Sequence, residues 1–309
     1  METDSQFTLT RFAPWTEDFS FKSPMEQDRL VILNPEDVLW MSPVVARSRR
    51  TLEEHITYIR EQGIKKALVI AEDIGFLRQC PTLEEVQVIP AWSAVDFDYS
   101  PLYDMPNLKR VNCQTMYGPK ENKVAYVDYR RIPKLEEAVV SGKAGHCLEG
   151  MAGLRKFSLG QGQPGKKTLD GTVDVSALEE LDLCQTPLCS LKGLEQAKAL
   201  QKLSLSYNRS LEDISALAEL PLKTLEIEAC GKIRDFSVLE TLTELEELRL
   251  LGSNGIDDLG FLRKMPNLRE LHITMNVLDG DLSWCEHIPY VRCKNRKHYN
   301  RKDSQLPKG

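Results

Sequence analysis

The frame Leu-x-x-Leu-x-Leu recurs along this 309-residue chain at nearly constant spacing. Its clear copies begin at Leu178, Leu200, Leu222, Leu245 and Leu268, so successive copies start 22, 22, 23 and 23 residues apart. Within each copy the leucines alternate with other residues, which places the leucines on one side of a strand. One unit cannot bury its leucines alone, whereas stacked units share a continuous core. The spacing therefore predicts a solenoid in which each copy contributes one strand to a parallel sheet.

Less regular copies extend the repeat in both directions. They begin at Ile64, Leu83, Leu108, Leu135, Leu154 and Ile288. We therefore predict about ten to eleven repeat units over residues 64–293. Residues 1–63 are expected to form an N-terminal capping module, with strands at 29–33 and 38–41 and a helix at 51–62 whose residues Leu52, Ile56 and Ile59 share one face. Residues 294–309 are expected to form a basic, partly ordered C-terminal tail.

The second half of the unit also repeats, as Asp-apolar-(Ser/Gly)-x-Leu. It occurs as DISAL from 213, DFSVL from 235 and DLGFL from 258, and out of exact spacing as DIGFL from 73 and DYSPL from 98. The Asp or Ser can cap a short helical turn. The apolar residues of the phrase, such as Ile214 and Leu217, would close the core on the side opposite the strands. Tyr99 occupies the position of Ile214 and is therefore predicted to lie in the core.

These two phrases together resemble the leucine-rich-repeat family, and most closely the class that contains the phosphatase regulator Sds22 and the bacterial internalins. The resemblance covers residues 64–293. It implies an α/β solenoid with a curved parallel sheet on the concave face and short helical or 3-10 turns on the convex face. It also implies a non-catalytic scaffold that binds another protein on the concave sheet.

Composition limits the other possibilities. The formal net charge of −6 argues against general nucleic-acid binding. No stretch approaches the roughly 18 apolar residues of a membrane helix, and no signal peptide is evident in the first 25 residues. The eight cysteines form no CxxC pair, which favours reduced, buried thiols in a cytoplasmic protein. The alternative is a secreted or surface-associated effector that is exported without a classical signal.

One loop resembles a nucleotide-binding motif. Residues 160–168 read GQGQPGKKT, which matches both GxGxxG and GxxxxGK. However, Lys167 stands where a P-loop has its hydroxyl residue, and the following TLDGTVD is a poor helix. We interpret the stretch as an inserted loop. A nucleotide-binding enzyme that uses the Gly160–Lys166 loop is the least favoured alternative.

Other catalytic or metal-binding arrangements are not supported by the sequence. The five histidines lack the spacing of a zinc site. His272 is expected near Glu247 and Glu270 as a solvated surface pair, and His146 precedes Cys147, which is interpreted as a core cysteine. We therefore predict no catalytic residues, no metal and no cofactor.

The residues between the repeat leucines should form the partner-binding surface, because solenoids of this type bind through their concave sheet. The alternative role for any one of these charges is to keep an exposed sheet soluble. The surface is acidic over the units that begin at 178–268 and basic in the last unit. Its predicted members are Glu180, Asp182, Lys202, Glu226, Glu228, Glu247, Arg249, Glu270, His272, Tyr290 and Arg292.

A second, weaker site is predicted from the aromatic residues that gather between 92 and 129. Trp92 and Tyr117 lie just past the strands of the two longest units, in inserted loops. Aromatic side chains are enriched at binding hot spots. The alternative is that both pack onto the edge of the solenoid.

Overall fold

The computed structural model describes residues 30–33, 52–71, 73–90, 97–114, 127–141, 146–147, 153–161, 166–171 and 173–309. The chain divides into two compact units, Met1–Leu148 and Glu149–Gly309.

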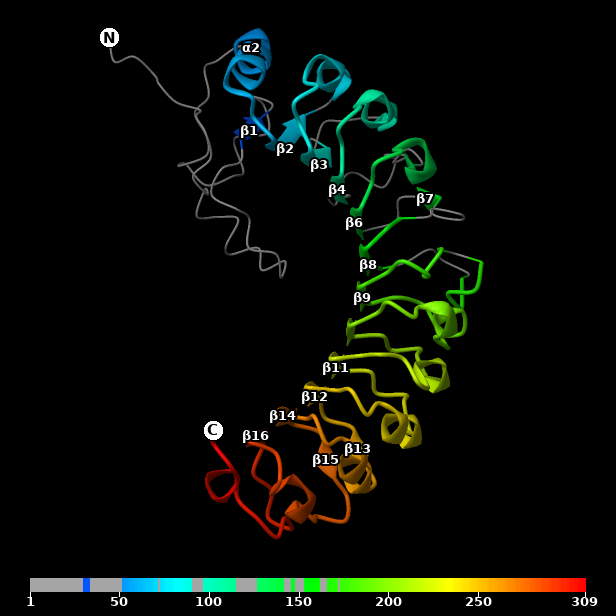
Figure 1. Cartoon of the computed structure of the whole chain (residues 1–309), viewed down its shortest axis with the longest axis vertical. Coiled ribbons are helices and arrows are strands. Elements are labelled where there is room, and N and C mark those ends of the chain that lie inside the picture. The colour runs from blue at the N-terminus through cyan, green and yellow to red at the C-terminus, as the bar shows by residue number, and fades with distance from the viewer. Residues whose placement is uncertain are drawn as a thin grey trace, which may run out of the picture. The chain divides into compact units, whose positions relative to one another are not determined.

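The described part of the first unit contains a parallel sheet and the α-helix α2 (Figure 1). The sheet runs in the order β1 (Leu30–Leu33), β2 (Lys66–Ala71), β3 (Glu85–Pro90), β4 (Arg110–Gln114) and β6 (Glu137–Ser141). Two short strands, β5 (Val127–Asp128) and β7 (His146–Cys147), pair separately. Helix α2 (Leu52–Gln62) leads directly into β2.

The second unit continues the same architecture. Its parallel sheet runs β8 (Lys156–Gly160), β9 (Glu180–Cys184), β10 (Lys202–Ser206), β11 (Thr224–Glu228), β12 (Glu247–Leu251), β14 (Glu270–Ile273) and β16 (Tyr290–Cys293). Strands β13 (Gly255–Ile256) and β15 (Asn276–Val277) form a separate pair. Figure 1 shows the strands of this unit along one side and its helical turns along the other. This is the predicted leucine-rich-repeat architecture.

The repeat frame determines where the strands lie. A strand begins two residues after each of the eleven predicted starts, from Ile64 to Ile288. The leucines that point inward are buried; Leu203, Leu225 and Leu248, for example, have no exposed surface. They also pair with one another without a shift, so that Leu203 faces Leu225 and Leu225 faces Leu248. Equal repeat lengths thus stack equivalent side chains into one continuous core.

Short 3-10 turns close the core on the side opposite the strands. The predicted Asp phrase forms their starts: the Asp213 carboxylate accepts a hydrogen bond from the Ser215 amide at 2.9 Å, and Asp258 accepts one from Gly260 at 2.6 Å. Tyr99 precedes such a turn and is fully buried, as predicted. The turns are η2 (Gly75–Gln79), η3 (Ser100–Asp104), η4 (Tyr129–Arg131), η5 (Leu194–Gln196), η6 (Ser215–Leu217), η7 (Ser237–Thr241), η8 (Gly260–Lys264) and η9 (Ser283–Cys285), while η10 (Asp303–Gln305) lies in the C-terminal segment beside β16.

The predicted helix is present, but its buried face is narrower than expected. Ile56 and Ile59 are buried, whereas Leu52 is 46% exposed and does not contribute to the core. Leu52 is the first residue of the helix, one turn before the first buried residue Ile56. The expected strand at 29–33 corresponds to β1, and the expected strand at 38–41 lies outside the described residues.

Residues 294–309, which we expected to be only partly ordered, fold back onto the last repeat. The Val291 amide donates to the Pro307 carbonyl at 3.0 Å, and the Gly309 amide donates to the Pro289 carbonyl at 2.9 Å. Leu306 is buried, and the Tyr299 hydroxyl accepts a hydrogen bond from the Val277 amide at 2.9 Å. The stretch therefore covers the outer edge of β16.

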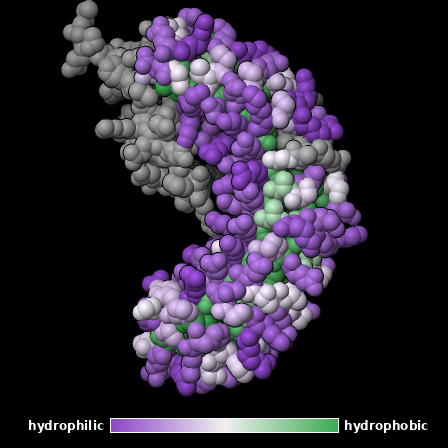
Figure 2. Space-filling model, in the orientation of Figure 1, coloured by the Kyte–Doolittle hydropathy of each residue, from purple (hydrophilic) through white to green (hydrophobic). Residues whose placement is uncertain are grey.

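Hydrophilic side chains make up most of the visible surface of the second unit, and hydrophobic atoms show mainly between them (Figure 2). Among the described residues, α2 and the 3-10 turns are all too short or too polar to span a lipid bilayer.

Candidate functional site

In the second unit, alternate residues of each strand point away from the core and line up in rows across the sheet. We call these residues of β9–β16 the sheet face. Its first row is Glu180, Lys202, Thr224, Glu247, Glu270 and Tyr290, and its second row is Asp182, Ser204, Glu226, Arg249, His272 and Arg292. Glu228 lies in the third row, opposite Ser206. The structure thus gathers the eleven residues predicted for the concave surface onto one face.

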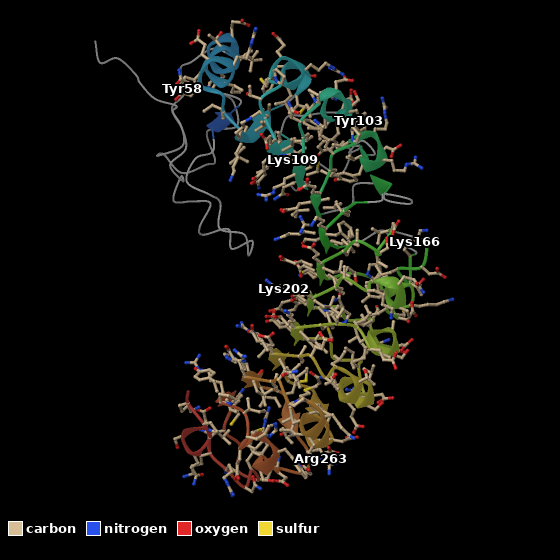
Figure 3. The ribbon with its side chains drawn as sticks, viewed as in Figure 1. Tyr58, Tyr103, Lys109, Lys166, Lys202 and Arg263 are labelled. Atoms are coloured by element: carbon tan, nitrogen blue, oxygen red, sulfur yellow. The ribbon has the colours of Figure 1, made fainter. Side chains whose placement is uncertain are left out.

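Figure 3 shows this separation of sides for two labelled side chains. Lys202 lies on the strand side of the second unit, and Arg263 lies on the side of the turns. Arg263 stacks there over the Trp284 ring, with its guanidinium carbon 4.6 Å from the ring centroid.

Arg249 is the centre of the charge arrangement on the sheet face. Its guanidinium pairs with Glu247 on the same strand and lies 3.9 Å from Glu226 on β11 and 3.9 Å from Glu270 on β14. We call these four residues the Arg249 cluster. Three carboxylates share one guanidinium, so the cluster keeps an excess of two negative charges. The Glu226 side chain is only 16% exposed, which means that this excess charge is partly withdrawn from water.

His272 contacts one of its two expected carboxylates. Its Nε2 atom lies 2.7 Å from Glu270, and its ring centroid lies 5.8 Å from that of Tyr290. Glu247 instead contacts Arg249. His272 therefore joins the Arg249 cluster to the aromatic and basic residues of β16.

The charges at the β9 edge of the sheet face are matched by β8. Glu180 pairs with Lys156 at 2.7 Å, and Glu179 pairs with Arg155 at 2.7 Å. The Asp182 carboxylate accepts a hydrogen bond from the Ser158 hydroxyl at 2.9 Å. By contrast, Lys202 on β10 is exposed and makes no ion pair with any residue that the structure describes.

A groove of about 450 Å³ crosses the sheet face at the beginning of the strands. Two residues at the start of each of five strands line it, the residue just before the strand and the first strand residue: Glu179 and Glu180 at β9, Gln201 and Lys202 at β10, Lys223 and Thr224 at β11, Glu246 and Glu247 at β12, and Arg269 and Glu270 at β14. The first member of each pair was not predicted, because only the residues that alternate with the second and third leucines were expected to face outward. These unpredicted residues all occupy the repeat position just before the strand.

The corresponding face of the first unit has its charges matched within itself. Glu84 pairs with Lys65 at 2.8 Å and with Lys109 at 3.0 Å, and Arg110 pairs with Glu137 at 3.2 Å. Hydrogen bonds from Lys65 and Lys109 lower the pKa of Glu84 to about 2. The described charges of this face therefore offer less to an incoming partner than those of the second unit.

The Gly-Lys loop lacks the context that nucleotide binding needs. It follows β8, which ends at Gly160, but the described residues 166–171 and 173–178 form turns and an isolated bridge instead of a helix. Phosphate-binding loops hold the phosphates at a helix N-terminus. Lys166, labelled in Figure 3, lies on the side of the turns, away from the sheet face.

The second predicted site, Trp92 and Tyr117, lies outside the described residues. Among the neighbouring aromatics, Phe97 and Tyr99 are buried against each other with ring centroids 4.8 Å apart. Tyr103 is covered by the Arg131 guanidinium, 4.2 Å from the ring centroid, and its hydroxyl accepts a hydrogen bond from the Asp128 amide.

The described cysteines are free thiols, and most of them are deep in the fold. Cys80, Cys113, Cys230 and Cys285 are buried, while Cys184, Cys189 and Cys293 are partly exposed. Burial raises the pKa of Cys80 to about 11 and the pKa of Cys113 and Cys285 to about 12, so these thiols stay protonated and unreactive. The side chains of His146 and Cys147 lie outside the described residues. Across the described part of the chain, no group of three or more His, Cys, Asp or Glu is placed to hold a metal ion.

Comparison with known proteins gave few matches in sequence and many in structure. No family model matches the chain. A stretch of 111 residues, 36% of the chain, is 32% identical to the disease resistance protein RPS4B of Arabidopsis thaliana, of which it spans only 9%.

Among solved structures, 78% of the chain aligns with 38% of TLR13 in its complex with ssRNA13, at 15% identity and a TM-score of 0.52. An internalin (inlF) from Listeria monocytogenes aligns over 76% of this chain and 69% of its own, at 13% identity and a TM-score of 0.41. The chain thus spans well under two thirds of the Arabidopsis protein and of TLR13. The repeat frame, the unshifted parallel strands that it produces and the likeness to TLR13 show that the chain has the leucine-rich-repeat fold.

Proposed function

We propose that this chain is a non-catalytic scaffold that binds a partner protein on the sheet face of its second unit. The observation that carries the proposal is the Arg249 cluster, in which three carboxylates share one guanidinium on an open parallel sheet. Solenoid repeats characteristically use such a sheet for binding. A surface that served solubility alone would gain nothing from holding an excess of like charge in a partly buried cluster.

The sign of the charge supports a protein partner over a nucleic acid. TLR13, the neighbour in fold, is in complex with an RNA. On the sheet face of this chain, however, carboxylates outnumber cationic side chains from β9 to β14, and the net charge of the chain is −6. Nucleic-acid binding depends on cations that neutralise phosphates. We therefore favour a protein that presents Lys or Arg side chains to the Arg249 cluster.

We further propose that the protein acts in the cytoplasm. The seven described cysteines are free, which fits a reducing compartment. Asn208 also supports this proposal, because it begins the glycosylation sequon Asn208-Arg209-Ser210 and yet its side chain is fully buried. It accepts two hydrogen bonds from Thr186 and donates one to the Leu183 carbonyl. A glycan attached at Asn208 would be incompatible with this packing.

The test is affinity capture from a native lysate with three baits. The first bait is the wild-type chain, and the second carries Glu226→Lys, Glu228→Lys and Glu247→Lys on the sheet face. The third is a control with the same change in charge, Glu240→Lys, Glu244→Lys and Asp257→Lys, at exposed positions away from the sheet face.

We expect a protein that the wild type and the control retain and that the sheet-face variant loses. Thermal unfolding of all three should be similar, because none of the replaced side chains belongs to the buried core. Equal retention by all three baits would place the binding surface elsewhere. A collapse of the melting temperature in the second bait would contradict the outward orientation of these side chains.

A further inference from the structure

The shape of the groove across β9–β14 limits what can occupy it. Neighbouring strands lie about 4.8 Å apart, so a groove that crosses five strands is about 19 Å long. An extended segment of about six residues spans this length.

The charges at the two ends of the groove are compensated by neighbouring residues. On β9, Glu179 and Glu180 are paired with Arg155 and Lys156. On β14, Arg269 and Glu270 carry opposite charges, and Glu270 also contacts His272. The ends of the groove therefore have little net charge to offer.

The middle of the groove carries charges of opposite sign that are not fully compensated. Lys202, the first residue of β10, and Lys223, just before β11, are exposed, and neither makes an ion pair within the described part of the chain. At the start of β12, Glu246 and Glu247 are adjacent, and the Arg249 guanidinium that pairs with Glu247 is shared with two other carboxylates. The groove thus changes from basic over β10–β11 to acidic over β12.

We propose that the groove binds an extended segment of the partner protein with an acidic side chain over Lys202 and Lys223 and a basic side chain over Glu246 and Glu247. The inference rests on the proposed function, since it specifies the partner of the same sheet face. The two charge centres are about one and a half strand spacings apart, roughly 7 Å, which is two residues of an extended chain. Residues two apart in an extended segment point to the same side. The recognised pattern is therefore an acidic residue and a basic residue separated by one other residue.

The experiment is a selection of random displayed peptides, each long enough to cross five strands, on the immobilised full chain. Parallel selections use the variants K202E/K223E and E246K/E247K. The control variant is K198E/K264E, which makes the same change in charge as K202E/K223E at exposed positions just after turn η5 and at the end of turn η8. Circular dichroism melting confirms that each variant is folded before selection.

We expect the wild-type chain and the control to enrich peptides with the acidic-x-basic pattern. These peptides should bind K202E/K223E and E246K/E247K about tenfold more weakly or worse, because like charges then face each other across the contact. K202E/K223E should instead select peptides with basic residues at both positions.

Two other results would overturn the inference in distinguishable ways. Peptides that depend on the groove residues but lack the charge pattern would refute the proposed chemistry and leave the binding role of the sheet face intact. If no peptide is enriched, or if the enriched peptides bind all variants equally, the groove is not a binding site. In that case, only the capture experiment with the Glu226, Glu228 and Glu247 variant could still support the sheet face as a binding surface.

Discussion

A residue in the left-handed conformation follows each of four successive strands. Gln161, Gln185, Tyr207 and Ala229 have φ values of 62°, 55°, 56° and 53° and follow β8, β9, β10 and β11. In each case the backbone amide donates to the last carbonyl of the next strand, as Tyr207 does to Glu228 at 2.8 Å and Ala229 to Leu251 at 2.8 Å. This conformation lets the chain leave the strand while keeping the sheet hydrogen-bonded. It is unfavourable for any residue with a Cβ atom.

This conformation gives a prediction for a pair of opposite substitutions. Ala229→Gly should raise the free energy of unfolding by about 0.5 kcal/mol, because glycine relieves the strain of φ 53°. Gly193→Ala should lower it by about 2–4 kcal/mol, because φ is 101° and the new Cβ would lie 2.5 Å from the Asp170 amide nitrogen. Urea unfolding at neutral pH measures both changes. Equal effects of the two substitutions would contradict the assigned conformations.

Polar residues beside the strands show how far single positions can be predicted. Asn208 lies just past β10, and its side chain satisfies two backbone groups, the Thr186 amide and the Leu183 carbonyl. Asn276 also follows the end of a repeat strand, but its side-chain oxygen is buried with no hydrogen-bond partner among the described residues. The backbone of Asn276 instead belongs to the short sheet of β13 and β15, so similar residues at similar positions of the repeat have different roles.

At the scale of the element, the Asp-capped turn is the most regular feature after the strand. Asp213 accepts hydrogen bonds from the Ser215 hydroxyl at 2.6 Å, the Ser215 amide at 2.9 Å and the Ser190 hydroxyl at 2.7 Å. These bonds, those from Ser215 above all, hold the pKa of Asp213 below its ordinary value. The same hydrogen bond from the serine amide two residues later occurs at Asp174 in DVSAL and at Asp281 in DLSWC, which were not predicted.

The lowered pKa of Asp213 predicts a pH dependence. A carboxylate with a lowered pKa contributes stability above its unfolded-state pKa and loses that contribution as the pH falls through its folded-state pKa. Asp213→Asn should therefore destabilise the protein at pH values above about 4, the ordinary pKa of an aspartate side chain, and its difference from the wild type should shrink in more acidic solution. Urea unfolding across this pH range measures the difference. A difference that stays constant with pH would contradict a role for the ionised carboxylate.

At the scale of the whole chain, the repeat frame was sufficient to locate the eleven repeat strands and the side of the sheet on which their side chains lie, but it did not indicate the short strands β5, β7, β13 and β15. The frame is periodic, so residues at the same position of different repeat units lie in the same environment. The groove could not be located in this way, because it depends on which charges are compensated by the neighbouring strand. Glu180, for instance, belongs to the predicted acidic surface but pairs with Lys156, 24 positions earlier in the chain. The fold of residues 294–309 could not be predicted from the sequence either, because these residues contain no repeat.

The packing of this last segment predicts the effect of removing it. Deleting residues 303–309 removes buried Leu306 and the hydrogen bond to the Val291 amide, and exposes the edge of β16. We expect the free energy of unfolding to fall by about 2–4 kcal/mol and the open edge to promote self-association. Leu306→Ala is the matched control, because it weakens the packing and keeps the edge covered. Thermal melting and sedimentation velocity separate the two effects, and a deletion variant that behaves like the wild type would refute this capping role.

The unshifted pairing of the strands has a consequence for how such a chain can evolve. In each strand, alternate residues form the core, and the residues between them form the sheet face. Selection can change the residues of the sheet face without changing those of the core. Duplication of a whole unit would add one strand and move the charges on either side of it apart by one strand spacing, about 4.8 Å. What this protein recognises can therefore change quickly while its fold stays the same.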